Sequence, residues 1–158
     1  MEPEFLVFGK LTREYLLPTT GPARLDVAGG SLLYAAAGLR MWKSEIGLVG
    51  RVGYDYPREW LNACIARGFD TRGIRVVSKN FDMREFLAYN ESFEPNQINP
   101  VSHFARREMT FPKSLLGYQP TDDKKKPDPE SILMVTDIPN DYQMARAALL
   151  CPDRKSVV

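Results

Sequence analysis

Metal ligands and cysteine pairs are scarce in this sequence of 158 residues. His103 is the single histidine, and Cys64 and Cys151 are the two cysteines. A zinc site needs several such ligands at close spacing, and a disulfide framework needs several cysteine pairs. The N-terminal Met-Glu-Pro-Glu is acidic where a secretory signal is basic. We therefore expect no metal site, reduced cysteines and a cytoplasmic location.

The sequence also lacks an excess of charge and a long apolar run. Lysine and arginine number 21 and aspartate and glutamate number 20, so the net charge is +1. This balance gives no reason to expect nucleic acid as a partner. No apolar run approaches the roughly 20 residues of a membrane-spanning helix, so no membrane contact is expected. The one concentrated basic run, Lys124–Lys126, precedes Pro127 and indicates a solvated loop.

What the sequence does contain is an alternation of apolar runs and helical patterns. Helix is favoured where alanine and leucine dominate, and a second helix is expected to start at Pro57 and end before Gly68. Such alternation predicts an α/β sandwich with a mostly parallel sheet. The expected core elements are strands at Phe5–Gly9, Glu45–Val49 and Ile132–Val135 and helices at Leu32–Trp42, Pro57–Arg67 and Asp141–Leu150.

A further set of short runs predicts smaller strands outside the core. They lie at Tyr15–Leu17, Leu25–Val27, Ile74–Val77 and Arg84–Tyr89. The stretch Asn90–Glu130 is polar and interrupted by six prolines, which is typical of a functional loop, a lid or an insertion.

The pair Gly29–Gly30 stands at a strand-to-helix junction, with Ser31 as the expected helix cap. A glycine pair there lets a ligand approach the backbone, and a helix N-terminus offers N–H groups. The glycine pair alone also fits a simple turn. Its order and spacing relative to other motifs therefore decide whether it indicates a ligand site.

Four landmarks follow one another at a characteristic spacing. Gly9 is followed five residues later by Glu14, and Gly29–Gly30 is followed by Tyr34. The strand and turn of Ile46–Asp55 and the tetrapeptide Gly68–Thr71 (Gly-Phe-Asp-Thr) complete the series. In this order the chain resembles the ribokinase-like (PfkB-type) carbohydrate kinases from about Phe5 to Leu150.

The resemblance implies a three-layer α/β sandwich with a small β lid, formed by segments at about 15–27 and 74–89. It implies ATP-dependent phosphoryl transfer to a hydroxyl of a sugar or nucleoside. Glu14, Gly29, Gly30 and Tyr34 would bind the acceptor, and the lid would often serve as a homodimer contact. ATP and Mg²⁺ would be bound mainly by a C-terminal half.

The family's catalytic Gly-Ala-Gly-Asp motif does not occur in this sequence, so no catalytic residue is expected here. We interpret residues 1–152 as the N-terminal part of such a kinase domain, with a long loop at 90–130. Residues 153–158 match the translation of a sequencing adapter, although a natural polar tail has the same composition.

Departures from the family pattern leave alternatives open. Glu14 stands where an aspartate is usual, Tyr34 where an asparagine is usual, and Lys43 where a glycine ends the helix. A catalytically inactive relative that binds a small metabolite fits these changes. A nucleotide-binding Rossmann domain fits less well, because no G-x-G-x-x-G follows the first strand.

Overall fold

The computed structural model describes residues 2–120 and 126–152, which divide into two compact units. The core unit consists of residues 2–11, 29–83 and 126–152. The small unit consists of residues 12–28 and 84–120. The expected tail at 153–158 and most of the basic run at 124–126 lie outside the described residues.

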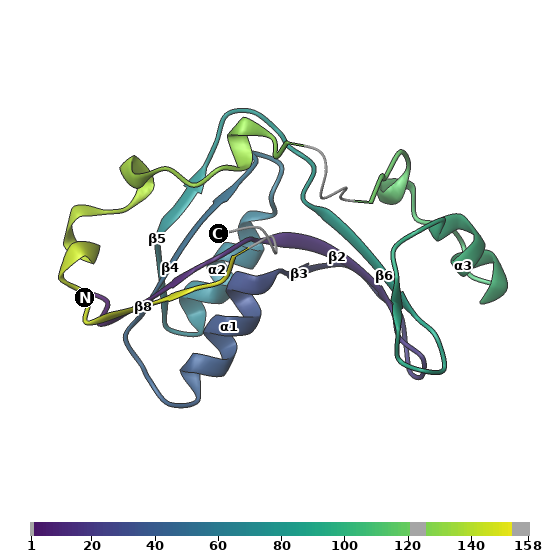
Figure 1. The fold of residues 1–158 in the computed structure, drawn as a ribbon, viewed down its shortest axis with the longest axis horizontal. Coiled ribbons are helices and arrows are strands. Elements are labelled where there is room, and N and C mark those ends of the chain that lie inside the picture. The colour runs from purple at the N-terminus through teal and green to yellow at the C-terminus, as the bar shows by residue number, and fades with distance from the viewer. Residues whose placement is uncertain (1, 121–125, 153–158) are drawn as a thin grey trace. The chain divides into compact units, whose positions relative to one another are not determined.

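The core unit is built on a parallel sheet with the strand order β5-β4-β1-β8 (Figure 1). Every pair of neighbours in this sheet is parallel, as the alternation of strands and helices predicted. The expected α/β class is therefore confirmed. The strands are β1 (Phe5–Phe8), β4 (Ile46–Val52), β5 (Phe69–Val76) and β8 (Ala147–Leu150).

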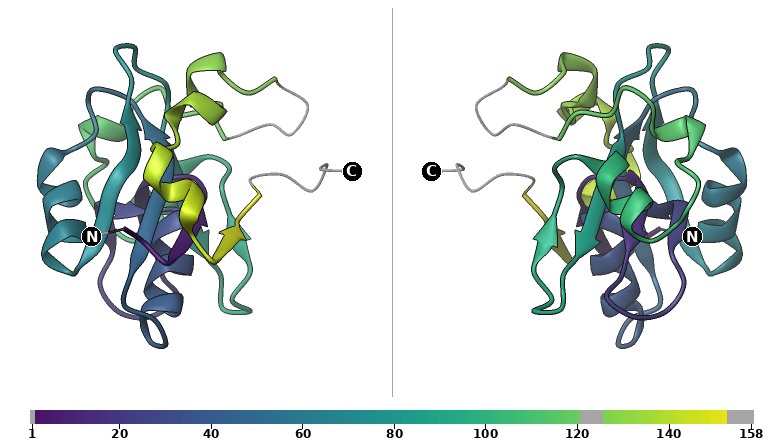
Figure 2. Two further views of the ribbon diagram at one scale, coloured as in Figure 1. Left: turned by 90° about the vertical axis from the view of Figure 1, so that its left-hand side faces the viewer. Right: turned by 90° about the vertical axis from the view of Figure 1, so that its right-hand side faces the viewer.

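Two helices, α1 (Ser31–Arg40) and α2 (Arg58–Ala66), pack on one face of this sheet (Figure 2). Both were expected within two residues of these bounds. Helix α2 starts directly after Pro57, and the chain turns away at Gly68, whose φ of +83° favours glycine. The apolar core between sheet and helices includes Val7, Leu32, Leu48, Val52 and Cys64.

The opposite face of the core sheet is covered by residues 129–145, here called the strap. The strap is a chain of single 3₁₀ turns: η2 (Pro129–Ser131), η3 (Val135–Asp137) and η4 (Asn140–Met144). Tyr142 is its main apolar anchor and is 1% exposed. A parallel sheet needs cover on both faces, and here an irregular segment provides the second cover.

Two expectations for this region are wrong. Residues 132–135 form no strand, and residues 141–150 form a 3₁₀ turn and strand β8 instead of a helix. Alanine and leucine in β8 favour a helix locally, but pairing with β1 overrides this preference. The amide of Cys151 continues the pairing by donating to the carbonyl of Phe8 at 2.8 Å.

The small unit contains a second sheet with the order β3-β2-β6-β7. Strands β2 and β6 are parallel neighbours at its centre. Only residues 84–89 of the expected lid segment 74–89 belong here, because Ile74 pairs with Gly50 in the core sheet. The strands are β2 (Thr12–Leu17), β3 (Arg24–Gly29), β6 (Arg84–Tyr89) and β7 (Pro95–Asn96).

The proline-rich stretch at 90–130 is only partly a loop. It includes β7, helix α3 (Pro100–Arg106) and the 3₁₀ turn η1 (Lys113–Leu115). Phe104, Leu115 and Tyr118 from this stretch are buried in the small unit. No helix among residues 2–120 and 126–152 is long and apolar enough to cross a membrane.

Candidate functional site

Helix α1 begins at the carboxyl end of strand β1. The amide of Lys10 donates to Ser31 Oγ, and the amide of Leu32 donates to the Lys10 carbonyl, both at 3.1 Å. Gly9 permits this approach, since a Cβ there would lie 2.9 Å from the Leu32 nitrogen. Ligands of open parallel sheets bind at the carboxyl ends of the strands, so the junction lies where a binding site is expected.

Gly30 occupies the N-cap position of α1 with φ of 102° and ψ of 160°. Only glycine adopts this conformation without strain. Ser31 was expected to cap the helix, but no side-chain cap exists. Its hydroxyl instead accepts the Lys10 amide hydrogen bond, because Gly30 has already taken the cap position.

A third glycine of the sequence pattern lies at the same edge of the core sheet. Gly53 follows β4, where a Cβ would lie 2.9 Å from Asp55 Oδ1 and 3.1 Å from Asn80 Oδ1. The same Asn80 oxygen accepts a hydrogen bond from the Asp55 amide at 3.3 Å. Gly9, Gly30 and Gly53 thus all lie at the carboxyl edge formed by the neighbouring strands β1 and β4.

The amides of residues 32–34 in the first turn of α1 are used within the protein. The amide of Leu32 is bound to Lys10, and those of Leu33 and Tyr34 donate to the Gly30 carbonyl at 3.1 and 3.2 Å. Nor do three or more His, Cys, Asp or Glu side chains gather as metal ligands in the described parts of the chain. These residues therefore do not fit Mg²⁺–ATP, and the binding of ATP outside them stays a prediction.

Glu14 lies on β2 in the small unit and is 3% exposed. Thr12 Oγ1 donates a hydrogen bond of 3.3 Å to Glu14 Oε1. The parallel pairing of β2 and β6 sets Glu14 beside Glu85, so two glutamates share one face of the sheet. Sequence reasoning missed Glu85, whose only signal is its place in the predicted strand at 84–89.

The expected acceptor residues are divided between the two units. Gly29, Gly30 and Tyr34 belong to the core unit, whereas Glu14 belongs to the small unit. Tyr34 lies one turn into α1 and is 57% exposed. A cleft shared by Glu14 and Gly30 stays a prediction.

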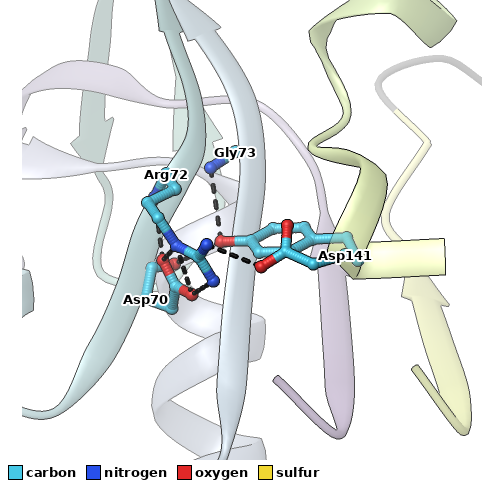
Figure 3. Close-up of polar contacts among 5 residues, drawn as sticks. Asp70, Arg72, Gly73 and Asp141 are labelled. Carbon is cyan, nitrogen blue, oxygen red and sulfur yellow. Dashed lines mark hydrogen bonds and ion pairs between the residues drawn. The ribbon is translucent and has the colours of Figure 1, made fainter. Parts of the chain in front are cut away.

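The tetrapeptide Gly68–Thr71 has a structural role in this molecule. Asp70 accepts hydrogen bonds from the Arg72 guanidinium, which also donates to Asp141 at 2.6 Å (Figure 3). Burial alone would raise the pKa of Asp70, but the hydrogen bonds from Arg72 outweigh it and the pKa is lowered. This network joins β5 to the strap, so the Asp70 carboxylate stabilises the fold.

No protein-family model and no curated protein sequence matches this chain. Solved structures similar to it are sugar and nucleoside kinases, of the kind that the sequence predicted. One is the ribokinase of Cryptococcus neoformans var. grubii serotype A in complex with ADP, which has a TM-score of 0.48 and a sequence identity of 16%. The match covers 62% of this chain and 33% of the ribokinase chain. The PfkB protein of Polaromonas sp. JS666 has a TM-score of 0.45 at 22% identity over 60% and 34%.

A third structure is the nucleoside kinase of Burkholderia thailandensis in complex with inosine. Its TM-score is 0.47 at 12% identity, over 58% of this chain and 35% of its own. The chain thus spans about a third of the length of the structures it matches.

Proposed function

We propose that this chain supplies the acceptor-binding part of a sugar or nucleoside kinase. The parent enzyme would transfer the γ-phosphoryl group of ATP, with Mg²⁺, to a hydroxyl of the acceptor in the cytoplasm. One observation supports the proposal: Gly9, Gly30 and Gly53, at the sequence positions of the family pattern, all lie beyond the carboxyl ends of the neighbouring strands β1 and β4. Phosphoryl transfer relies mainly on positioning, which such an edge provides.

Each proposed acceptor residue has a chemical role. A carboxylate accepts several hydrogen bonds and has no donor of its own when ionised, so Glu14 would accept from sugar hydroxyls. Gly29 and Gly30 would let the acceptor lie against the backbone. Tyr34 would contribute one hydroxyl and an aromatic surface at the margin of the site.

A second candidate function is an inactive relative that binds a small metabolite. The specific observation in its favour is the first turn of α1, in which the amides of residues 32–34 are used within the protein. Binding without phosphoryl transfer would need no phosphate site at this edge.

Calorimetric titration with pentoses, hexoses and nucleosides tests the proposal. We expect one class of acceptor to bind, and Glu14→Gln to weaken it about tenfold or more, since a hydrogen bond to a charged group contributes about 1.5–3 kcal/mol. Glu91→Gln, at an exposed position, is the matched control and should bind like the unaltered chain. Equal affinity of the Glu14 and Glu91 variants would remove Glu14 from the site.

A further inference from the structure

A pocket lies in the part of the small unit that covers one side of its sheet, residues 98–120, here called the cover segment. Phe104 and Leu115 of this segment are each 1% exposed and pack with Tyr15 and Phe86 of the sheet. The pocket is open to solvent, has a volume of about 330 Å³ and is lined by residues 98–101, 111 and 115–120. This volume is at the lower end of the range for small-molecule sites, so the pocket admits a compact ligand.

Exposed aliphatic side chains gather at this pocket. The described part of the small unit has four exposed large apolar side chains: Phe93, Ile98, Val101 and Leu116. The last three line the pocket and are 57–69% exposed. Single exposed apolar residues are ordinary, but several around one hollow mark a binding surface. The fold does not require them, because Phe104 and Leu115 make the core contacts of this segment.

The lining of the pocket is neutral, which determines the kind of ligand that fits. None of the described residues that line it is charged. Phe111, Tyr118 and two prolines provide apolar surface, and the side-chain amides of Asn99 and Gln119 both donate and accept hydrogen bonds. A charged ligand would lose hydration here without gaining an opposite charge, whereas a neutral ring with one polar edge would lose little.

The pocket is separate from the proposed acceptor residue Glu14. Glu14 and Tyr15 are successive residues of β2, so their side chains point to opposite faces of the sheet, and the cover segment packs on the Tyr15 face. One contact leads from the pocket to β6: the Tyr118 hydroxyl accepts a hydrogen bond from the Phe86 amide at 3.3 Å. A ligand that shifts Tyr118 therefore acts directly on the strand that carries Glu85.

We propose that this pocket is a binding site for a neutral, mainly apolar small molecule of one or two fused rings with a hydrogen-bonding group at its edge. The apolar body of the ligand covers the exposed side chains of Ile98, Val101 and Leu116. Its polar edge bonds to the side-chain amide of Asn99 or Gln119. This site goes beyond the proposed acceptor site and does not depend on it.

Indole is the probe that tests the proposal, because it is a neutral fused ring with one N–H donor. Titration into the full 158-residue chain, followed by proton–nitrogen correlation spectra, should give saturable one-site binding with a dissociation constant of about 1 mM or lower. The amides that shift should lie within residues 98–119 and at Phe86. Indole-3-acetate and tryptamine, which carry a negative and a positive charge, should bind about tenfold more weakly.

A charge placed at the pocket identifies the site. Val101→Glu should weaken the binding of indole about tenfold and strengthen that of tryptamine, because a carboxylate then lines the pocket. Val135→Glu is the matched control, since Val135 is 85% exposed and belongs to the core unit. The control should bind all three probes like the unaltered chain. Both valines are exposed, so both variants should fold, which thermal unfolding verifies.

Three outcomes would overturn the proposal. The first is that indole shifts none of the named amides up to its solubility limit. The second is that Val101→Glu and Val135→Glu bind indole equally. The third is that the unaltered chain binds the charged analogues as tightly as indole, which would show an unselective apolar contact. None of these outcomes bears on the sugar and nucleoside titrations, so the two proposals fail separately.

Discussion

Arg51 and Asp137 form a two-point ion pair between β4 and the strap. Arg51 Nε lies 2.6 Å from Asp137 Oδ2, and Arg51 Nη2 lies 3.1 Å from Asp137 Oδ1. The side chains are only 14% and 5% exposed. Burial works against the charge of Asp137, but the hydrogen bonds from Arg51 and the Met134 amide outweigh it and lower its pKa. This buried pair is one of the polar contacts that hold the strap on the core sheet.

Asp137→Asn should destabilise the core unit, because it leaves the Arg51 charge buried without its partner. Breaking such a pair from one side costs about 3–5 kcal/mol of unfolding free energy. Urea unfolding of the variant and the unaltered chain measures this loss of unfolding free energy. Glu130→Gln is the control, because its partner Lys79 is 76% exposed at 3.7 Å and an exposed pair is worth at most about 1 kcal/mol. Equal losses in the two variants would contradict the assigned role.

The same pair predicts how stability depends on pH. The pKa values of Asp137 and Asp70 are lowered in the folded chain, so their contribution is complete above the ordinary carboxyl pKa of about 3.9. It is lost as the pH falls through the folded values. Burial, followed by the charges of Arg106 and Arg107, also lowers the pKa of His103. That effect weakens the fold below about pH 6.5 in every variant.

Unfolding curves at a series of pH values separate these contributions. The difference in stability between the unaltered chain and Asp137→Asn should be constant near neutral pH and shrink below about pH 4. A difference that stays constant to low pH would show that the Asp137 charge contributes nothing.

Two buried tyrosines of the small unit should respond in opposite directions to loss of the hydroxyl. Tyr15→Phe removes a buried hydroxyl that has no hydrogen-bond partner within residues 2–120 and 126–152, and it should raise stability by about 1 kcal/mol. Tyr118→Phe removes the acceptor of the Phe86 amide hydrogen bond at 3.3 Å and should lower it by about 1–3 kcal/mol. Thermal unfolding of both variants measures this, and a stabilising Tyr118→Phe would contradict it.

Alanine substitutions at two glycines of the core unit should also change stability in opposite directions. A Cβ at Gly73 would lie 2.5 Å from the Leu48 carbonyl and 2.7 Å from Tyr142 Cε2, so Gly73→Ala should cost about 1–3 kcal/mol. Nothing lies within 4 Å of a Cβ at Gly38 in α1, so Gly38→Ala should stabilise by about 1 kcal/mol. Denaturant unfolding compares the two variants, and a neutral Gly73→Ala would show that both β4 and Tyr142 move aside easily.

The sequence predicted elements whose local pattern agrees with their surroundings. β6 was expected at Arg84–Tyr89 and lies there, because alternating apolar residues suit a half-buried strand. The run at 147–150 was expected as helix, since pairing with β1 involves residues some 140 positions away and leaves no local signal. The structure of the strap was not predicted for the same reason, because Asp137 and Asp141 form ion pairs with arginines on distant strands.

For the candidate site, glycine positions were the most informative. The backbone at position 30 adopts a conformation that favours glycine, so the residue type alone indicates it. The carboxylate positions were harder, because Glu85 faces Glu14 only through the pairing of β2 with β6. Ser31 is a good cap by type, but the approach of Lys10 decided its partner.

The 158-residue chain alone should transfer no phosphoryl group from ATP to any sugar or nucleoside. Its sequence has no phosphate-binding glycine loop with a following lysine and no Gly-x-Gly-Asp element, and the amides of residues 32–34 in the first turn of α1 are engaged. Loss of a positioned base costs a factor of about 100 to 10,000, and loss of donor positioning costs about 7–11 kcal/mol more. A coupled measurement of ADP release over a panel of acceptors, with a full-length sugar kinase as positive control, checks this. Acceptor-dependent ADP release near the rate of that control would show that catalysis resides within these residues. That result would also refute the proposal that the chain supplies only the acceptor-binding part.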